Sequence, residues 1–192
     1  DGDTGTNMLL TARAALEALE QAPPAAGRAE LARVLARGSL LGARGNSGVI
    51  ASQILRGALD ALAAVGSPAQ ALAGARDAGY AAVREPVEGT ILSMIRELAE
   101  EAAACGDLAA GELFPALVRR GHEALARTPE QLPTLLEAGV VDAGAAGLLE
   151  VVRGLAAPIA GEPLPPQADP EPLALAAVHQ ELSRYRYCTV FA

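Results

Sequence analysis

Apolar residues recur along most of this chain at the three- and four-residue spacing of an α-helix, and this pattern constrains the fold most. It is clear over residues 7–21, where the Pro23-Pro24 pair then ends it. Runs of β-branched and aromatic residues, which are typical of strands, are absent until the last few positions. The sequence therefore predicts an all-α fold.

Glycine, proline and aspartate divide this pattern into about eight helical segments that are joined by short loops. A short loop cannot carry the chain to the far end of a helix, so consecutive helices should be antiparallel neighbours. We therefore expect an antiparallel helical bundle or a closed helical barrel. The predicted helices span residues 7–21, 28–41, 47–65, 68–84, 88–105, 111–127, 129–137 and 143–157.

A proline-rich stretch divides the chain near its C-terminal end. Residues 158–172 have the composition of an extended, semi-rigid linker. Residues 173–192 follow as a short helix candidate and a strand candidate, which indicates the start of a further domain. We therefore predict a helical domain over residues 1–157. The chain begins inside a loop without an initiator methionine, so we also expect a segment to precede it.

The charge and the composition exclude several classes of function. A net charge of -8 would repel a nucleic-acid backbone. All 15 basic residues are arginines, so the lysine of a Walker A loop or of a protein kinase is missing. Cys105 and Cys188 lack the spacing of a disulfide framework or a zinc site. No apolar run is long enough to span a membrane, and we expect a cytoplasmic protein.

Two aspartates flank a glycine just before the first predicted helix. Asp1 and Asp3 can turn toward one hard cation such as Mg²⁺, which prefers oxygen ligands and bridges nucleotide phosphates. The helix start beyond them offers backbone N–H groups and a favourable dipole to a phosphate. Taken alone, this loop is more simply interpreted as a helix cap. The residues placed to meet a phosphate are Thr4, Gly5, Thr6 and Asn7.

A second glycine-rich loop, at residues 42–48, precedes another predicted helix and changes this interpretation. A helix stop followed by a cap would explain one glycine and one polar residue, but not the whole segment. Two such loops in one helical domain favour anion binding. Its candidate ligands are Asn46, Ser47 and Gly48. Two further residues at helix starts, each of which alone is more simply a cap, are Thr90 and Asp142.

Four segments carry a family resemblance. DGDTGTNM (1–8), GARGNSGV (42–49), EPVEGTILS (85–93) and GVVDAGAAGL (139–148) resemble, in this order, the landmark motifs of the DhaL-like nucleotide-binding domain of dihydroxyacetone kinases. The second and third segments are more similar to the N-terminal domain of the nucleotide-binding subunit of bacterial fatty acid kinase. The resemblance covers roughly residues 1–157.

This resemblance implies an α-helical barrel that holds ATP or ADP at one end, with Mg²⁺ coordinated by Asp1 and Asp3. It implies transfer of the γ-phosphoryl group to a fatty acid carboxylate, which a separate, DegV-like lipid-binding protein presents. The family usually has a further metal ligand upstream, so the isolated chain is expected to be incomplete and without a certain catalytic residue of its own. The implied nucleotide contacts are Thr4, Gly5, Thr6, Asn7, Asn46, Ser47, Gly48, Thr90 and Asp142.

Three alternatives remain open from the sequence. The chain could be a nucleotide subunit of a dihydroxyacetone kinase, which would phosphorylate a small ketose on its own partner. It could be a regulatory module that binds nucleotide without turnover. It could also be a helical interaction domain whose glycine loops are plain caps. An apolar helix face could, in addition, support a homodimer.

Overall fold

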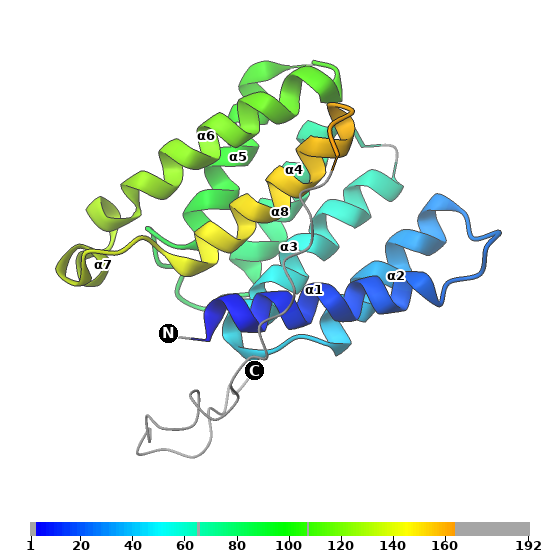
Figure 1. The fold of residues 1–192 in the computed structure, drawn as a ribbon, viewed down its shortest axis with the longest axis horizontal. Coiled ribbons are helices and arrows are strands. Elements are labelled where there is room, and N and C mark those ends of the chain that lie inside the picture. Colours follow the sequence, from blue (N-terminus) through cyan, green and yellow to red (C-terminus); the bar gives the residue numbers. More distant parts are fainter. Residues whose placement is uncertain (1–2, 65, 107, 164–192) are drawn as a thin grey trace, which may run out of the picture.

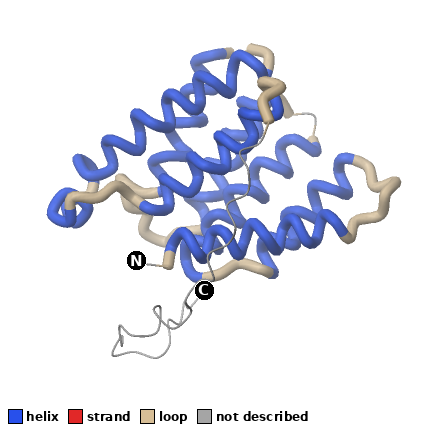
Figure 2. Tube along the Cα trace, in the orientation of Figure 1, coloured by secondary structure: helices blue, strands red, loops and turns tan. Residues whose placement is uncertain are grey.

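A computed structural model describes residues 3–64, 66–106 and 108–163 of the chain. These residues form eight α-helices and no β-strand, which confirms the predicted all-α fold (Figures 1 and 2). The candidate helix and strand of residues 173–192 lie outside the described part. The last helix continues to Ile159, so the first residues of the predicted linker are helical. No described helix is both long and apolar enough to cross a membrane.

The helices follow the apolar pattern of the sequence closely, and the second has the bounds that were predicted. Prolines and polar caps define several of their starts. The fourth helix begins with a capping box, in which the Ser67 and Gln70 side chains each bond the other's backbone N–H. The elements are α1 (Thr4–Glu20), α2 (Arg28–Leu41), α3 (Gly45–Ala63), α4 (Pro68–Ala81), α5 (Ile91–Cys105), α6 (Ala110–Gln131), α7 (Pro133–Ala138) and α8 (Ala143–Ile159).

Helix α6 continues through Pro129, so the predicted break between two helices at this point was wrong. Pro129 has no N–H to donate to the Leu125 carbonyl, and a proline in a helix usually leaves that carbonyl unpaired. Here the Thr128 hydroxyl donates to the Leu125 carbonyl at 2.9 Å. Because that carbonyl stays paired, the helix reaches Gln131 before it ends.

Helix α5 forms the centre of the domain. Its residues 91–95 are all buried, which is typical of a helix enclosed on every side. It packs against α4, α6 and α8. The predicted helix start at Glu88 was wrong, because residues 86–90 form a loop in which Gly89 has a φ of 79°. Thr90 caps α5 instead.

The first and last helices pack together and close the arrangement, as the predicted barrel requires (Figure 1). A Cβ on Gly147 of α8 would lie 2.7 Å from the Met8 sulfur of α1, so this helix contact requires glycine at position 147. Helices α3 and α4 also approach closely, since a Cβ on Gly57 would lie 2.2 Å from the Gly74 carbonyl oxygen. Glycines therefore permit the close helix packing that brings distant loops together.

Candidate functional site

Four helices, α1, α3, α5 and α8, begin at the same end of the domain, which is at the left of Figure 1. The starts of α5 and α8 are in contact, because a Cβ on Gly144 would lie 3.2 Å from the Ile91 Cβ. The starts of α1 and α3 are in contact at Asn7 and Gly45. Each helix N-terminus carries backbone N–H groups without intrahelical partners and the positive end of the helix dipole. This end of the domain is therefore suited to bind an anion.

The first loop does not serve as a simple helix cap. Asp3 occupies the N-cap position of α1, but its side chain makes no capping hydrogen bond. Its carboxylate instead accepts a hydrogen bond of 2.9 Å from the Asn7 side-chain amide. Residues 4–6 form the first turn of the helix, where N–H groups lack helical acceptors. Asp1, the other predicted metal ligand, lies outside the described residues.

The second loop packs directly onto the first helix. The Arg44 N–H donates to the Thr11 hydroxyl at 3.2 Å. Gly45 has a φ of 58°, and a Cβ there would lie 2.5 Å from the Asn7 amide nitrogen. A Cβ on Gly48 would lie 2.4 Å from the Thr11 hydroxyl oxygen. The two predicted phosphate loops are thus neighbours, and the glycines of the second loop are required for their close approach.

Helix α3 begins at Gly45, two residues earlier than the sequence predicted. Asn46 and Ser47 therefore lie within its first turn rather than before it. Arg44 occupies the N-cap position and makes no side-chain capping bond. The starts of α1 and α3 are accordingly adjacent, and neither is capped by the side chain of its own N-cap residue. Their first-turn N–H groups can be satisfied by an external anion.

Thr90 and Asp142 both act as caps, which was the simpler interpretation of each. The Thr90 hydroxyl accepts from the Leu92 N–H at 3.3 Å. The Asp142 carboxylate accepts from the Ala145 N–H at 2.7 Å, and the Asp142 N–H donates to the Thr128 hydroxyl at 3.1 Å. These bonds fix the loops beside the other two helix starts. A direct nucleotide contact by Thr90 or Asp142 stays a prediction.

Burial raises the pKa of the Asp142 carboxyl above its ordinary value. Hydrogen bonds from the backbone N–H groups of Ala145, Gly144 and Ile91 oppose this shift without cancelling it. The ionised carboxylate at the start of α8 is therefore held at a cost in free energy. Ionisable residues whose pKa is shifted in this way are frequent at functional sites.

The sequence analysis did not single out Glu88, which organises the third loop, residues 86–90 before α5. Its carboxylate accepts hydrogen bonds from the Tyr80 hydroxyl at 2.9 Å, the Ser93 hydroxyl at 2.8 Å and the Arg96 guanidinium at 2.9 Å. Burial opposes ionisation of Glu88, but these bonds outweigh it and hold the pKa of the carboxyl below its ordinary value. The sequence pointed to Glu88 only through its place inside the third motif, EPVEGTILS. Its bonding partners on α4 and α5 could be found only from the fold.

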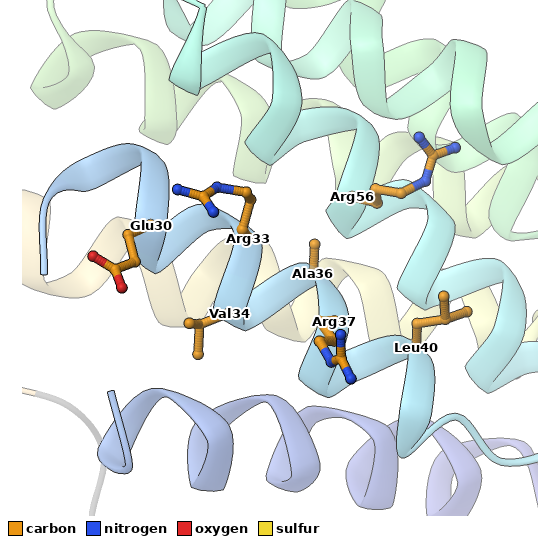
Figure 3. Close-up of a pocket in the computed structure, with 7 residues that line it drawn as sticks. All are labelled: Glu30, Arg33, Val34, Ala36, Arg37, Leu40 and Arg56. Atoms are coloured by element: carbon orange, nitrogen blue, oxygen red, sulfur yellow. The ribbon is translucent and has the colours of Figure 1, made fainter. Parts of the chain in front are cut away.

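Two shallow hollows lie away from these loops. One of about 520 Å³ is lined by residues of α2 and α3, which include Arg33, Arg37 and Arg56 (Figure 3). The other, of about 490 Å³, lies between α2 and α3 and is lined mainly by leucine and alanine. None of the predicted site residues lines either hollow. The helix starts remain the candidate site, because N–H donors there can bind phosphates without an apolar cavity.

Among the described residues, no group of three or more His, Cys, Asp or Glu side chains is arranged to hold a metal ion. The described oxygen donors at the first loop are the Asp3 carboxylate and its neighbouring amide and hydroxyl groups. Mg²⁺ is usually bound by one or two carboxylates, by water and by the phosphates of a substrate. This donor set therefore fits a cation that arrives with a nucleotide better than a cation held by the protein alone.

The chain belongs to the DAK2 domain family, whose type is the nucleotide-binding domain of dihydroxyacetone kinases. The model of this family matches residues 1–157, which include all four loops. Domains of this type are associated with kinases and bind ADP or ATP.

Two relatives are similar to most of this chain. Protein YloV of Bacillus subtilis is 40% identical over 181 residues, which cover 88% of this chain and 32% of that protein. An uncharacterised protein of Staphylococcus epidermidis is 39% identical over 175 residues, with coverage of 88% and 32%. The chain thus spans about a third of the length of the relatives that it matches.

Proposed function

We propose that this chain is the Mg-ATP-binding part of a kinase that transfers the γ-phosphoryl group to a fatty acid carboxylate. The observation that carries the proposal is the pair of adjacent helix starts, α1 and α3. At neither start does the side chain of the N-cap residue make a capping hydrogen bond. Membership of the DAK2 family supports nucleotide binding at this place. The segments GARGNSGV and EPVEGTILS, which are typical of the fatty acid kinase branch, support the choice of acceptor.

The residues divide into two roles at this site. The first turns of α1 and α3, which contain Thr4, Gly5, Thr6, Asn46 and Ser47, would bind the phosphates through backbone N–H groups and hydroxyls. Asp3, with Asn7 beside it, would hold Mg²⁺, and the resemblance assigns Asp1 the same role. A bound magnesium ion supplies charge neutralisation at the phosphates.

The reaction needs little from the protein beyond positioning and charge stabilisation. A fatty acid carboxylate is already ionised at neutral pH, so no protein base has to remove a proton. One carboxylate oxygen forms a bond to the γ-phosphorus, and the bond from that phosphorus to the β–γ bridging oxygen breaks. The products are an acyl phosphate and ADP. A separate DegV-like protein would present the acyl chain at the open end of the domain.

An assay with the intact protein, Mg-ATP and a fatty acid carried by a DegV-like protein tests this proposal. The acyl phosphate is trapped with hydroxylamine as an acyl hydroxamate, and ADP release is followed in parallel. We expect hydroxamate and ADP in equal amounts, and only when the carrier is present. Phosphorylation of dihydroxyacetone instead would establish the dihydroxyacetone kinase alternative. Nucleotide binding without turnover on either acceptor would establish a regulatory module.

A further inference from the structure

Thr11 joins the first two loops, although neither motif drew attention to it. The residue is only 3% exposed. The hydroxyl donates to the Asn7 carbonyl at 2.7 Å and accepts from the Arg44 N–H at 3.2 Å. The second bond connects residues 33 positions apart in the sequence. One hydroxyl thus fixes the start of α3 against the first turns of α1.

Thr128 contacts the other two loops, one through its hydroxyl and one through its carbonyl oxygen. The residue is 1% exposed, and its hydroxyl donates to the Leu125 carbonyl and accepts from the Asp142 N–H. Its carbonyl oxygen lies against the third loop, where a Cβ on Gly89 would be 2.9 Å away. One buried residue at the end of α6 thus contacts the loops that begin α5 and α8.

We propose that Thr11 and Thr128 are positioning residues of the nucleotide site. Each hydroxyl fixes one loop against a neighbouring element, and together they hold the starts of α3 and α8 in place before a nucleotide binds. The inference rests on the proposed nucleotide binding and extends it to residues that touch neither phosphate nor metal.

The reasoning depends on what each hydroxyl leaves behind when it is removed. Valine has nearly the same shape as threonine, but it can neither donate nor accept a hydrogen bond. Thr11→Val leaves the Arg44 N–H without this partner, and Thr128→Val does the same to the Asp142 N–H. Thr128→Val also removes the donor to the Leu125 carbonyl, which is why its serine variant is the necessary comparison. Both bonds are part-buried, so an N–H that loses its partner destabilises the loop in its present position, and the loop can relieve this by moving away. Such a movement would change the phosphate-binding geometry.

Calorimetric titration of the intact protein with Mg-ATP tests this inference, at a temperature where circular dichroism shows each variant folded. The variants are Thr11→Val and Thr128→Val, each with its matched serine variant, which keeps the hydroxyl. Ser39→Ala is the control, because Ser39 is also buried but its hydroxyl bonds only the Ala36 carbonyl of its own helix. Ser39→Ala therefore removes a buried hydroxyl without removing a hydrogen bond to any of the loops.

We expect each valine variant to raise the Kd for Mg-ATP about tenfold, the equivalent of one lost hydrogen bond. The serine variants should restore most of the affinity, and Ser39→Ala should lose stability without a change in Kd. If the valine variants bind Mg-ATP as tightly as the unmodified protein, the inference about Thr11 and Thr128 is overturned and the proposed function is not. Failure of the unmodified protein to bind Mg-ATP would overturn the proposed function as well.

Amide hydrogen exchange provides a second test that needs no variant. In the unmodified protein without nucleotide, the N–H groups of Arg44 and Asp142 should exchange slowly, because the loops are already fixed. Exchange of these two amides at the rate of an unstructured peptide would overturn the inference, even if every variant failed to fold.

Discussion

Replacing Gly45 with alanine should weaken both the fold and nucleotide binding, by an amount that the structure allows us to work out. Gly45 has a φ of 58°, a conformation that costs a residue with a Cβ about 1 to 2 kcal/mol. The new Cβ would also lie 2.5 Å from the Asn7 amide nitrogen, so that side chain must move. Movement of the Asn7 side chain breaks its hydrogen bond to Asp3. This bond is partly exposed, so it contributes about 1 kcal/mol. The total loss is about 2 to 3 kcal/mol.

Urea unfolding measures this loss, and Gly139→Ala isolates its two parts. Gly139 has a φ of 66°, but a Cβ there would meet nothing within 4 Å. Gly139→Ala should therefore cost only the conformational part, about 1 to 2 kcal/mol. Gly45→Ala should also raise the Kd for Mg-ATP, because Asp3 and Asn7 no longer hold their arrangement. Equal losses of stability in the two variants, with unchanged nucleotide affinity, would refute this reasoning.

Two further predictions concern pH. The lowered pKa of Glu88 gives stability that is present above the ordinary glutamate pKa and is lost as the pH falls through the lower folded value. Glu88→Gln should therefore lower the thermal midpoint at neutral pH, and an equal deficit well below that pKa would contradict the argument. The raised pKa of Asp142 has the opposite sign, because its stabilising effect is present in acid and is lost as the pH rises through the raised value. Asp142→Asn should then be more stable than the unmodified protein at neutral pH but not in acid. A midpoint that is lower at every pH would show that the carboxylate stabilises α8.

Much of the fold could be predicted from the sequence because helix periodicity is a local property. The apolar pattern located all eight described helices, and the polar residues before α5 and α8 marked their caps. The error at Pro129 arose because the sequence rule treats proline as a helix breaker. It does not anticipate that the hydroxyl of Thr128 replaces the missing N–H as the partner of a carbonyl.

The grouping of the site residues could be predicted only in part. Glycine-rich segments before helices identified the loops, and the family resemblance indicated that they belong together. The bonds that join them could not be predicted, since the Arg44–Thr11 bond connects residues 33 positions apart and the Asp142–Thr128 bond residues 14 apart. Such contacts depend on how the helices pack, which local patterns do not specify.

Calorimetric titration of the intact protein with ATP, in the presence and absence of Mg²⁺, tests the central claim most directly when Asp3→Asn is measured beside it. Asparagine keeps the size of Asp3 and an acceptor for the Asn7 amide, but it removes the charge. We predict magnesium-dependent binding of ATP by the unmodified protein and its loss in Asp3→Asn. Absence of binding by the unmodified protein, or equal magnesium-dependent binding by both, would contradict the account.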